Sequence, residues 1–376
     1  MNAMMRSASV YGAVLVALLG ASWMNYTAEP KQELDGKVVL IPGEIDELTK
    51  VTWSSRNRDE AIIERKEDSI GSYYDVQYTR WTEVKKPKEP PKPPEPTEPE
   101  GPKTPEEADT PDTPDTPDTP DTPDTPEEAP EPEPEYTSKV SKFKSGEKAQ
   151  ELFKSLSPML ALRKLDAMSP DKLETTGLDD PKDALTFVRR GKTITLEVGG
   201  EVYGTRDRYV RDPSSGDVYL VDDELLRPLR YARTRLPDRT LWSVATADIA
   251  KVTIGSPDGS VEVLQKHAQD AEKASWVRVA TPDDTDEQLE TWMDKAMRMK
   301  SSAYSDEDDD LDGVELLFSL TIENESGTTE TIEVLRKPDD DKADYWGRSE
   351  HTRGTVKLLR GQSRALADDI SAIIGE

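Results

Sequence analysis

Residues 47–53 read ELTKVTW, and residues 248–254 repeat the pattern as DIAKVTI. Apolar and polar side chains alternate in both stretches, which is typical of a β-strand with one buried face. A second β-type run follows each of them, AIIER at residues 61–65 and VEVL at residues 261–264. The sequence therefore predicts two copies of one β-rich unit.

An amphipathic helix is expected in each copy after its third strand. Apolar residues at three- and four-residue spacing mark it in the first copy: Ala149, Leu152, Phe153, Leu156 and Leu160. The same spacing marks it in the second copy: Leu289, Trp292, Met293, Ala296 and Met299. Asp284 and Asp286 are suitable caps for the second helix.

A hairpin, a short strand and a closing helix complete each copy, with Gly191 and Gly327 at the hairpin turns. These segments are expected at residues 185–198, 218–221 and 222–231 in the first copy and at residues 317–335, 356–359 and 362–374 in the second. We therefore expect an α+β fold of tandem duplicated modules, each a twisted antiparallel sheet with covering helices on one face.

A Pro-rich acidic tract at residues 85–135 interrupts the first copy. It holds 18 of the 29 prolines, and residues 109–126 are six consecutive Asp-Thr-Pro triplets. Because proline removes amide donors and fixes φ, we expect a disordered insertion. An envelope spacer and a drifting low-complexity insertion are both open interpretations. The second copy has only residues 281–286 at this place, so the two ends of the tract should lie close together.

An uncharged stretch of 22 residues lies between Arg6 and Glu29 and is just long enough to span a bilayer. Arg6 precedes it and acidic residues follow it, so the N-terminus should stay cytoplasmic. We expect a single-pass inner-membrane protein with a periplasmic or extracellular body. A signal peptide cleaved after residues 20–22 is the alternative.

These features predict five parts of the chain. They are an anchor or signal segment at residues 1–28, the first part of module one at residues 37–84, the insertion at residues 85–135, the rest of module one at residues 136–242, and module two at residues 243–376.

The composition excludes several classes of protein. A net charge of −28 repels phosphate backbones, so we expect no nucleic acid partner. The absence of cysteine excludes disulfides, thiolate catalysis and cysteine zinc sites.

The residues Leu178-Asp179-Asp180-Pro181, the hairpin that follows them, Tyr209-Val210-Arg211 and the arginine-rich stretch at residues 229–241 resemble the bacterial family called domain of unknown function 4340. The resemblance is good over residues 140–300 and looser elsewhere. It implies one N-terminal membrane segment, a large exported part and genes often placed beside gliding-type ABC-transporter components. It brings no catalytic residues.

Five arginines form an island in this acidic chain: Arg227, Arg230, Arg233, Arg235 and Arg239. A helix would place the first three along one side, where they could bind an anionic partner. Ion pairs with the chain's own carboxylates are the competing interpretation.

Other chemistry is sparse. Residues 306–312 (DEDDDLD) resemble a calcium loop, but Ser319 stands where the bidentate glutamate belongs, so a solvated acidic loop is preferred. The two histidines, His267 and His351, are expected in exposed polar turns. The tryptophans are expected mostly in the core, with Trp346 a possible exception. We expect neither an enzyme nor a bound cofactor or metal.

The expected function is that of a membrane-anchored extracytoplasmic binding or scaffold protein. Its partners would be the bilayer and a membrane protein such as an ABC-transporter component. An anionic envelope polymer or lipid bound by the arginine island is the alternative, and a carboxylate hydrolase is a third reading.

A reporter fusion tests the predicted topology. Alkaline phosphatase fused after Glu376 should be active, because the positive-inside rule sends the C-terminal body across the membrane. A cytosol-active reporter fused at the same place is the control. Activity of the cytosolic reporter alone would contradict the predicted orientation.

Overall fold

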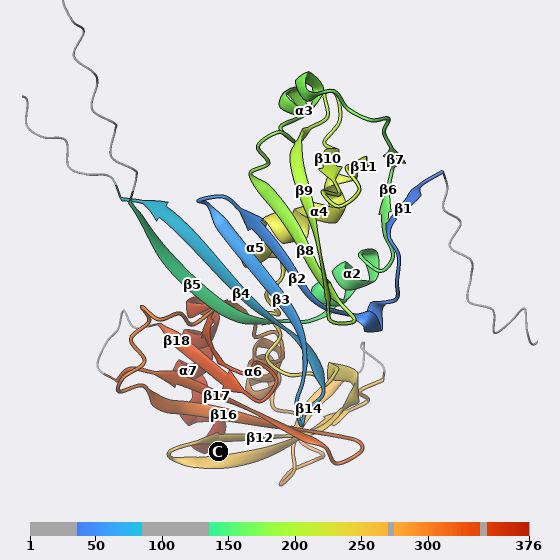
Figure 1. Ribbon diagram of the computed structural model, residues 1–376. Helices are drawn as coiled ribbons and strands as arrows, with labels where there is room; N and C mark the ends of the chain where they lie inside the picture. The colour runs from blue at the N-terminus through green and yellow to red at the C-terminus, as the bar shows by residue number, and fades with distance from the viewer. Residues whose placement is uncertain (1–35, 85–134, 270–273, 339–343, 376) are drawn as a thin grey trace, which may run out of the picture.

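Two antiparallel sheets lie side by side in the computed structural model, which describes residues 36–84, 135–269, 274–338 and 344–375 (Figure 1). We call the nine-stranded sheet with its helices the first module, and the eight-stranded sheet with its helices the second module. A third, two-stranded sheet pairs β1 (Val38–Ile41) with β6 (Met159–Ala161). The expected α+β class is confirmed.

The first module's sheet has the strand order β5-β4-β3-β2-β8-β9-β10-β11-β7. Its strands are β2 (Leu48–Ser55), β3 (Asp59–Glu67), β4 (Ser72–Glu83), β5 (Tyr136–Ser145), β7 (Arg163–Lys164), β8 (Asp183–Arg189), β9 (Lys192–Glu201), β10 (Arg208–Arg211) and β11 (Val218–Val221).

The second module's sheet has the order β14-β13-β12-β16-β17-β18-β19-β15. Its strands are β12 (Ile249–Ser256), β13 (Gly259–Lys266), β14 (Ser275–Arg278), β15 (Ser301–Tyr304), β16 (Glu315–Asn324), β17 (Thr329–Arg336), β18 (Tyr345–Ser349) and β19 (Thr355–Leu358).

The two sheets share one plan. The eight strands of the first sheet in the order β4-β3-β2-β8-β9-β10-β11-β7 correspond one by one to the second sheet's β14-β13-β12-β16-β17-β18-β19-β15. Each central strand has a register shift at the same place, between Leu48 and Lys50 in β2 and between Ile249 and Lys251 in β12. After these shifts the predicted alternation holds in both strands, because every second side chain is buried from Val51 to Ser55 and from Val252 to Ile254, while Leu48 and Ile249 are buried before the shifts.

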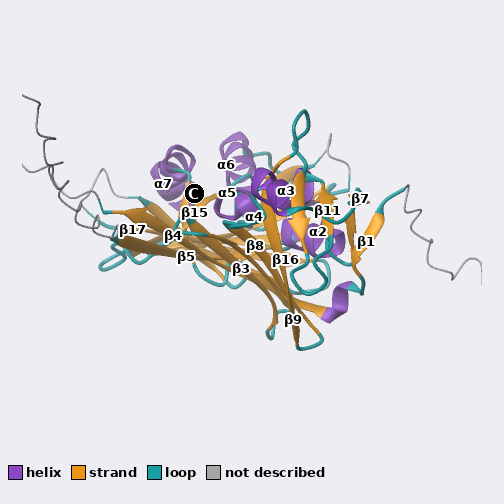
Figure 2. Ribbon diagram, turned by 45° about the horizontal axis from the view of Figure 1, so that its top comes forward, coloured by secondary structure: helices purple, strands orange, loops and turns teal. Residues whose placement is uncertain are grey.

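The helices gather on one side of the strands, as Figure 2 shows. They are α2 (Glu147–Ser155), α3 (Pro170–Thr176), α4 (Asp223–Arg230), α5 (Ala232–Arg235), α6 (Glu287–Met297) and α7 (Arg360–Gly375), and single 3-10 turns precede β2 (Ile45–Glu47) and β12 (Thr246–Asp248). The other face of each sheet is polar. There, equivalent threonine pairs bond across the strands, Thr186 with Thr195 at 3.1 Å and Thr321 with Thr331 at 2.9 Å.

Helix α6 confirms four of the five predicted stripe residues and the cap at Asp286, whereas Met299 lies beyond the helix end at Met297 and Asp284 is not the cap. Asp286 accepts a hydrogen bond from the backbone N–H of Leu289 at 2.9 Å, and the stripe residues are buried. Trp292 is 1 % exposed, stacks edge-on with Phe318 at 5.6 Å and donates its indole N–H to the Leu366 carbonyl at 3.0 Å. Burial of large apolar side chains of this kind drives the folding of each module.

Helix α2 is shorter than predicted. It ends at Ser155, and Leu160 lies in strand β6 instead of on the helix. Pro158 explains the difference, because proline disfavours helical backbone at the residue before it. Ala149, Leu152, Phe153 and Leu156 are buried as expected.

Strand β5 is an addition that the sequence did not predict. It pairs with β4 along its whole length, from Tyr74 opposite Ser145 to Glu83 opposite Tyr136, and it has no counterpart in the second sheet. The N–H of Val84 donates to the Glu135 carbonyl at 2.8 Å, so the residues flanking the Pro-rich tract are neighbours, as predicted.

The predicted membrane segment and the Pro-rich tract lie outside the described residues. Among the helices that the structure describes, none is long and apolar enough to cross a bilayer.

Replacing Trp292 tests the core of the second module. Trp292→Ala should lower the free energy of unfolding by about 4 kcal/mol, because it opens a cavity and removes the hydrogen bond from the indole N–H to the Leu366 carbonyl. Urea unfolding of the full chain measures the loss. Trp81→Ala, on a half-buried tryptophan of β4, should cost much less, and equal losses would contradict this description of the core.

Candidate functional site

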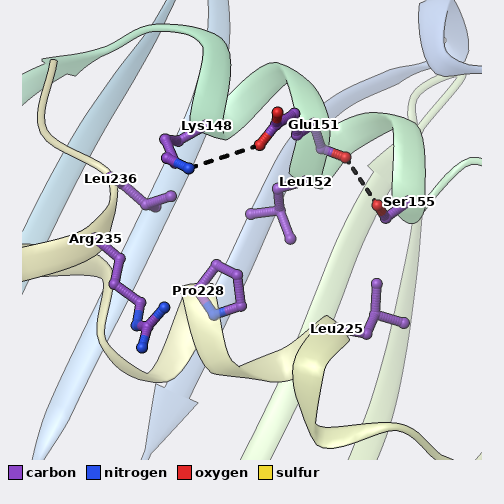
Figure 3. A pocket seen from close by; sticks show the side chains of 8 residues that line it. All are labelled: Lys148, Glu151, Leu152, Ser155, Leu225, Pro228, Arg235 and Leu236. Carbon is purple, nitrogen blue, oxygen red and sulfur yellow. Dashed lines mark hydrogen bonds and ion pairs between the residues drawn. The ribbon is translucent and has the colours of Figure 1, made fainter.

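A groove of about 430 Å³ runs between α2 and the α4–α5 pair on the helical side of the first module (Figure 3). Helix α2 supplies one wall, and α4 and α5 supply the other. We call this hollow the helical groove. Its eight lining residues are Lys148, Glu151, Leu152, Ser155, Leu225, Pro228, Arg235 and Leu236.

The floor of the helical groove is apolar. Leu152 and Leu236 are buried at its base, and Leu225 and Pro228 are half-buried along the wall from α4. Pro228 stands inside α4 and presents a ring without an N–H, which adds to the apolar surface. The partly accessible side chains of Leu225 and Pro228 are apolar surface that a partner can cover favourably.

The rim of the helical groove carries cations. In Figure 3, Lys148 and Arg235 reach toward the groove from opposite walls. Lys148 lies 4.0 Å from Glu151, an exposed pair of little energetic value. Arg235 is exposed, and its guanidinium makes neither a hydrogen bond nor an ion pair with any residue that the structure describes. One guanidinium is therefore available to an anionic group.

The arginine island is divided by the fold. Arg227 and Arg230 both pair with Asp223, whose side chain is 8 % exposed, so this one carboxylate offsets one of their two charges and holds both guanidinium groups in place. Helix α4 ends at Arg230, and the non-helical Tyr231 turns the chain before Arg233 and Arg235. The predicted single row of three arginines was therefore wrong. Arg233, Arg235 and Arg239 are exposed.

The acidic run at residues 306–312 is ion-paired. Lys139 of β5 contacts both Asp306, at 3.1 Å, and Asp308. Lys357 lies 3.3 Å from Asp309, and Lys337 pairs with Asp310. From the sequence, these carboxylates were expected to be solvated or to bind calcium. Four of them pair with lysines instead. Within the described residues, no group of three or more His, Asp or Glu could hold a metal ion.

A second cluster lies at the boundary between the modules. Lys144 of β5 donates to Asp238 at 2.9 Å and lies 2.8 Å from His351 Nε2. His351 Nε2 is also 3.1 Å from Asp238 and 2.9 Å from the Thr240 hydroxyl. We call Lys144, Asp238, Thr240 and His351 the junction cluster. His351 is only 14 % exposed at its side chain, so the expected exposed turn was wrong.

Burial and hydrogen bonds shift the pKa values of the junction cluster in opposite directions. Burial lowers the pKa of Lys144, although its bond to Asp238 acts against this shift. Burial alone would raise the pKa of Asp238, but bonds from His351, Thr240 and Lys144 outweigh it and hold the pKa well below the usual range. The carboxylate is therefore charged at any ordinary pH.

Two further side chains near the boundary are perturbed. Arg353 bonds to Asp68 through two nitrogens, at 2.5 and 2.9 Å, and this lowers the pKa of that carboxyl. Burial raises the pKa of the Tyr304 hydroxyl. Strong shifts of this kind gather at functional sites and at structural ion pairs alike.

The junction cluster could not be predicted from the sequence, because Lys144 and His351 are far along the chain from Asp238 and Thr240 and no pattern links the three places. The tryptophans were largely as expected, with Trp53, Trp276, Trp292 and Trp346 all buried. The suggested exposure of Trp346 was wrong, since it is 4 % exposed.

A family model described as Domain of unknown function (DUF4340) matches residues 145–312. The match begins at the last residue of β5 and ends in the acidic run, and it confirms the resemblance found in the sequence. No curated protein and no solved structure matches the chain.

Replacing Asp238 tests the junction cluster. Asp238→Asn should lower the free energy of unfolding at pH 7 by about 3 kcal/mol, because Lys144 would stay buried without its counter-ion. The folded-state pKa of Asp238 is depressed, so the stabilisation is present above pH 3.8 and declines as the pH falls below it. The difference between wild type and variant should therefore shrink in acid.

Urea unfolding between pH 3 and pH 7 makes this measurement. Lys251→Met, which breaks two half-exposed ion pairs on the polar face, with Glu262 and Glu323, is the control and should change stability by less than about 1 kcal/mol at any pH. A constant difference across the pH range would overturn the assignment to Asp238.

Proposed function

We propose that the chain is a non-catalytic binding or scaffold subunit, held at the outer side of the cytoplasmic membrane, that docks a segment of a partner protein in the helical groove. The observation that carries the proposal is an apolar floor beside Arg235. The guanidinium of Arg235 has no ion pair among the described residues. An acidic, amphipathic helix suits this surface, because its apolar side can cover the floor and its carboxylates can meet Arg235 and Lys148.

The charge of the chain adds selectivity to this docking. Most of the surface is acidic and repels acidic segments, whereas the helical groove has cations on its rim. An acidic partner would therefore be guided to the groove and turned away elsewhere.

The membrane assignment rests on the sequence of residues 7–28 and on the family resemblance. From the same resemblance, we expect an ABC-transporter component as the partner. The protein would be an accessory subunit of that envelope complex.

The shared plan of the two sheets supports an internal duplication, in which the helical groove has diverged. In the first module two short helices, α4 and α5, face α2, whereas in the second the single long helix α7 packs against α6. We infer that the first module took on partner binding while the second kept a closed helical layer.

Recognition of an anionic polymer or lipid by the arginine island has less support. Arg227 and Arg230 are both held in ion pairs with Asp223, and the remaining arginines do not share a helix face with them.

Site-specific crosslinking in native membranes tests the proposed docking. A photoreactive amino acid at Leu225, in the groove, should crosslink the full-length protein to a membrane-protein partner. The same probe at the exposed Thr331, on the polar face, should not.

A charge reversal then tests the role of the rim. Arg235→Glu should lower the Leu225 crosslink at least about fivefold, because it places an acid against an acidic partner. Arg206→Glu, at an exposed loop position away from the groove, has the same charge change and should leave the yield unaltered. Equal yields from all three proteins would refute docking in the groove.

A further inference from the structure

A second hollow, of about 200 Å³, lies between the two modules next to the junction cluster. Strands β4 and β5 of the first module supply one side of it. Strand β15 and the turn from Thr352 to Thr355 of the second module supply the other. We call it the junction cavity. Because both modules contribute, anything bound there contacts the two of them at once.

Three cations line the junction cavity. Lys144 is paired with Asp238, and Arg353 is paired with Asp68 and lies over the Tyr73 ring at 4.2 Å. Lys142 is exposed and has no ion pair with any residue in the described part of the chain. The cavity is therefore rich in positive charge, in a protein whose net charge is −28.

The carboxylate that lines the cavity does not cancel this charge. Asp75 is the single acid among the described lining residues, and it already pairs with Lys66. Asp68 and Asp238 each hold one cation and do not line the cavity themselves. After these pairings, Lys142 remains as an uncompensated positive charge.

Two hydroxyl groups in the cavity lining, those of Tyr304 and Ser305, make no hydrogen bond to a described group. Tyr304 is a lining residue whose hydroxyl oxygen is buried and has no hydrogen-bond partner among the described groups. Ser305, also in the lining, has no side-chain bond to a described residue. Buried polar groups are almost always satisfied in folded proteins, so an idle buried hydroxyl beside a cationic cavity indicates a missing acceptor.

We infer that the junction cavity binds a phosphate-sized oxyanion that bridges the two modules. Cations and hydroxyl donors around a small volume are the groups that oxyanions require. The volume suits one such ion with a few waters, given about 30 Å³ for a water molecule in the liquid. Free phosphate and the phosphate group of a larger molecule share this chemistry.

A bound oxyanion would add a further link between surfaces that the chain already joins through ion pairs and the Phe143–Tyr304 ring contact. A ligand that binds the folded state alone raises stability with its concentration. The junction would then be more stable in phosphate than in chloride.

Thermal unfolding of the full chain tests the inference. Unfolding is followed in phosphate and in sodium chloride at the same ionic strength and pH, and phosphate should raise Tm with a saturable dependence on concentration. Phosphate also stabilises proteins by exclusion from their surface. For this reason the decisive quantity is the difference between wild type and cavity variants.

Two variants remove cavity donors without removing an existing pair. Lys142→Gln should weaken phosphate binding by about tenfold, because it deletes the uncompensated charge. Tyr304→Phe should raise Tm in chloride, since it removes an unsatisfied buried hydroxyl, and yet weaken phosphate binding severalfold. Lys251→Gln, on the distant polar face, should respond to phosphate as the wild type does.

Glycerol phosphate in place of phosphate separates the two sources of the group. An equal, saturable shift indicates that the cavity admits a substituted phosphate, and a shift with phosphate alone indicates the free ion. The inference is overturned if wild type, Lys142→Gln and Tyr304→Phe all gain the same Tm in phosphate, because the gain would then be surface exclusion alone.

Discussion

The ion pair between Lys144 and Asp238 is the contact on which the arrangement of the two modules depends. Lys144 stands near the end of β5, Asp238 lies in the segment that connects the modules, and His351 reaches them from the second sheet. Three distant parts of the chain therefore come together around the Lys144–Asp238 ion pair. Because both charges are nearly buried, removing either one leaves the other as an uncompensated charge with little access to water.

Strand β5 supplies further contacts across this boundary. Lys139 reaches the acidic run, and Phe143 packs beside Tyr304 with 6.1 Å between the ring centroids. The second sheet has no equivalent strand. The element that distinguishes the two modules is thus also the element that joins them, and in Figure 1 it runs along the side of the first sheet that faces the second module.

The sequence predicted the repeated strands well because their alternation is strong and each copy supports the other. Val51 and Val252 are both fully buried, and Gly191 and Gly327 occupy hairpin turns with positive φ, where glycine is favoured. Strand β5 escaped prediction for the opposite reason. Its sequence, YTSKVSKFKS, contains three lysines and few apolar residues, and no second copy confirms it.

The sites were harder to predict than the fold. Arg235 of the arginine island is exposed, but neither the turn at Tyr231 nor the pairing of Arg227 and Arg230 with Asp223 could be predicted from spacing. His351 and Lys144 are separated by more than half of the chain, so only the folded structure brings them together.

The closing of β4 and β5 by the Val84–Glu135 bond has a consequence for how this protein can vary. The number of Asp-Thr-Pro triplets sets the length of a loop whose two ends are already fixed to each other. Doubling a loop adds only about 0.6 kcal/mol of closure entropy. Lineages can therefore gain or lose triplets with almost no penalty to the folded body, and the tract's reach can change independently of everything it is attached to.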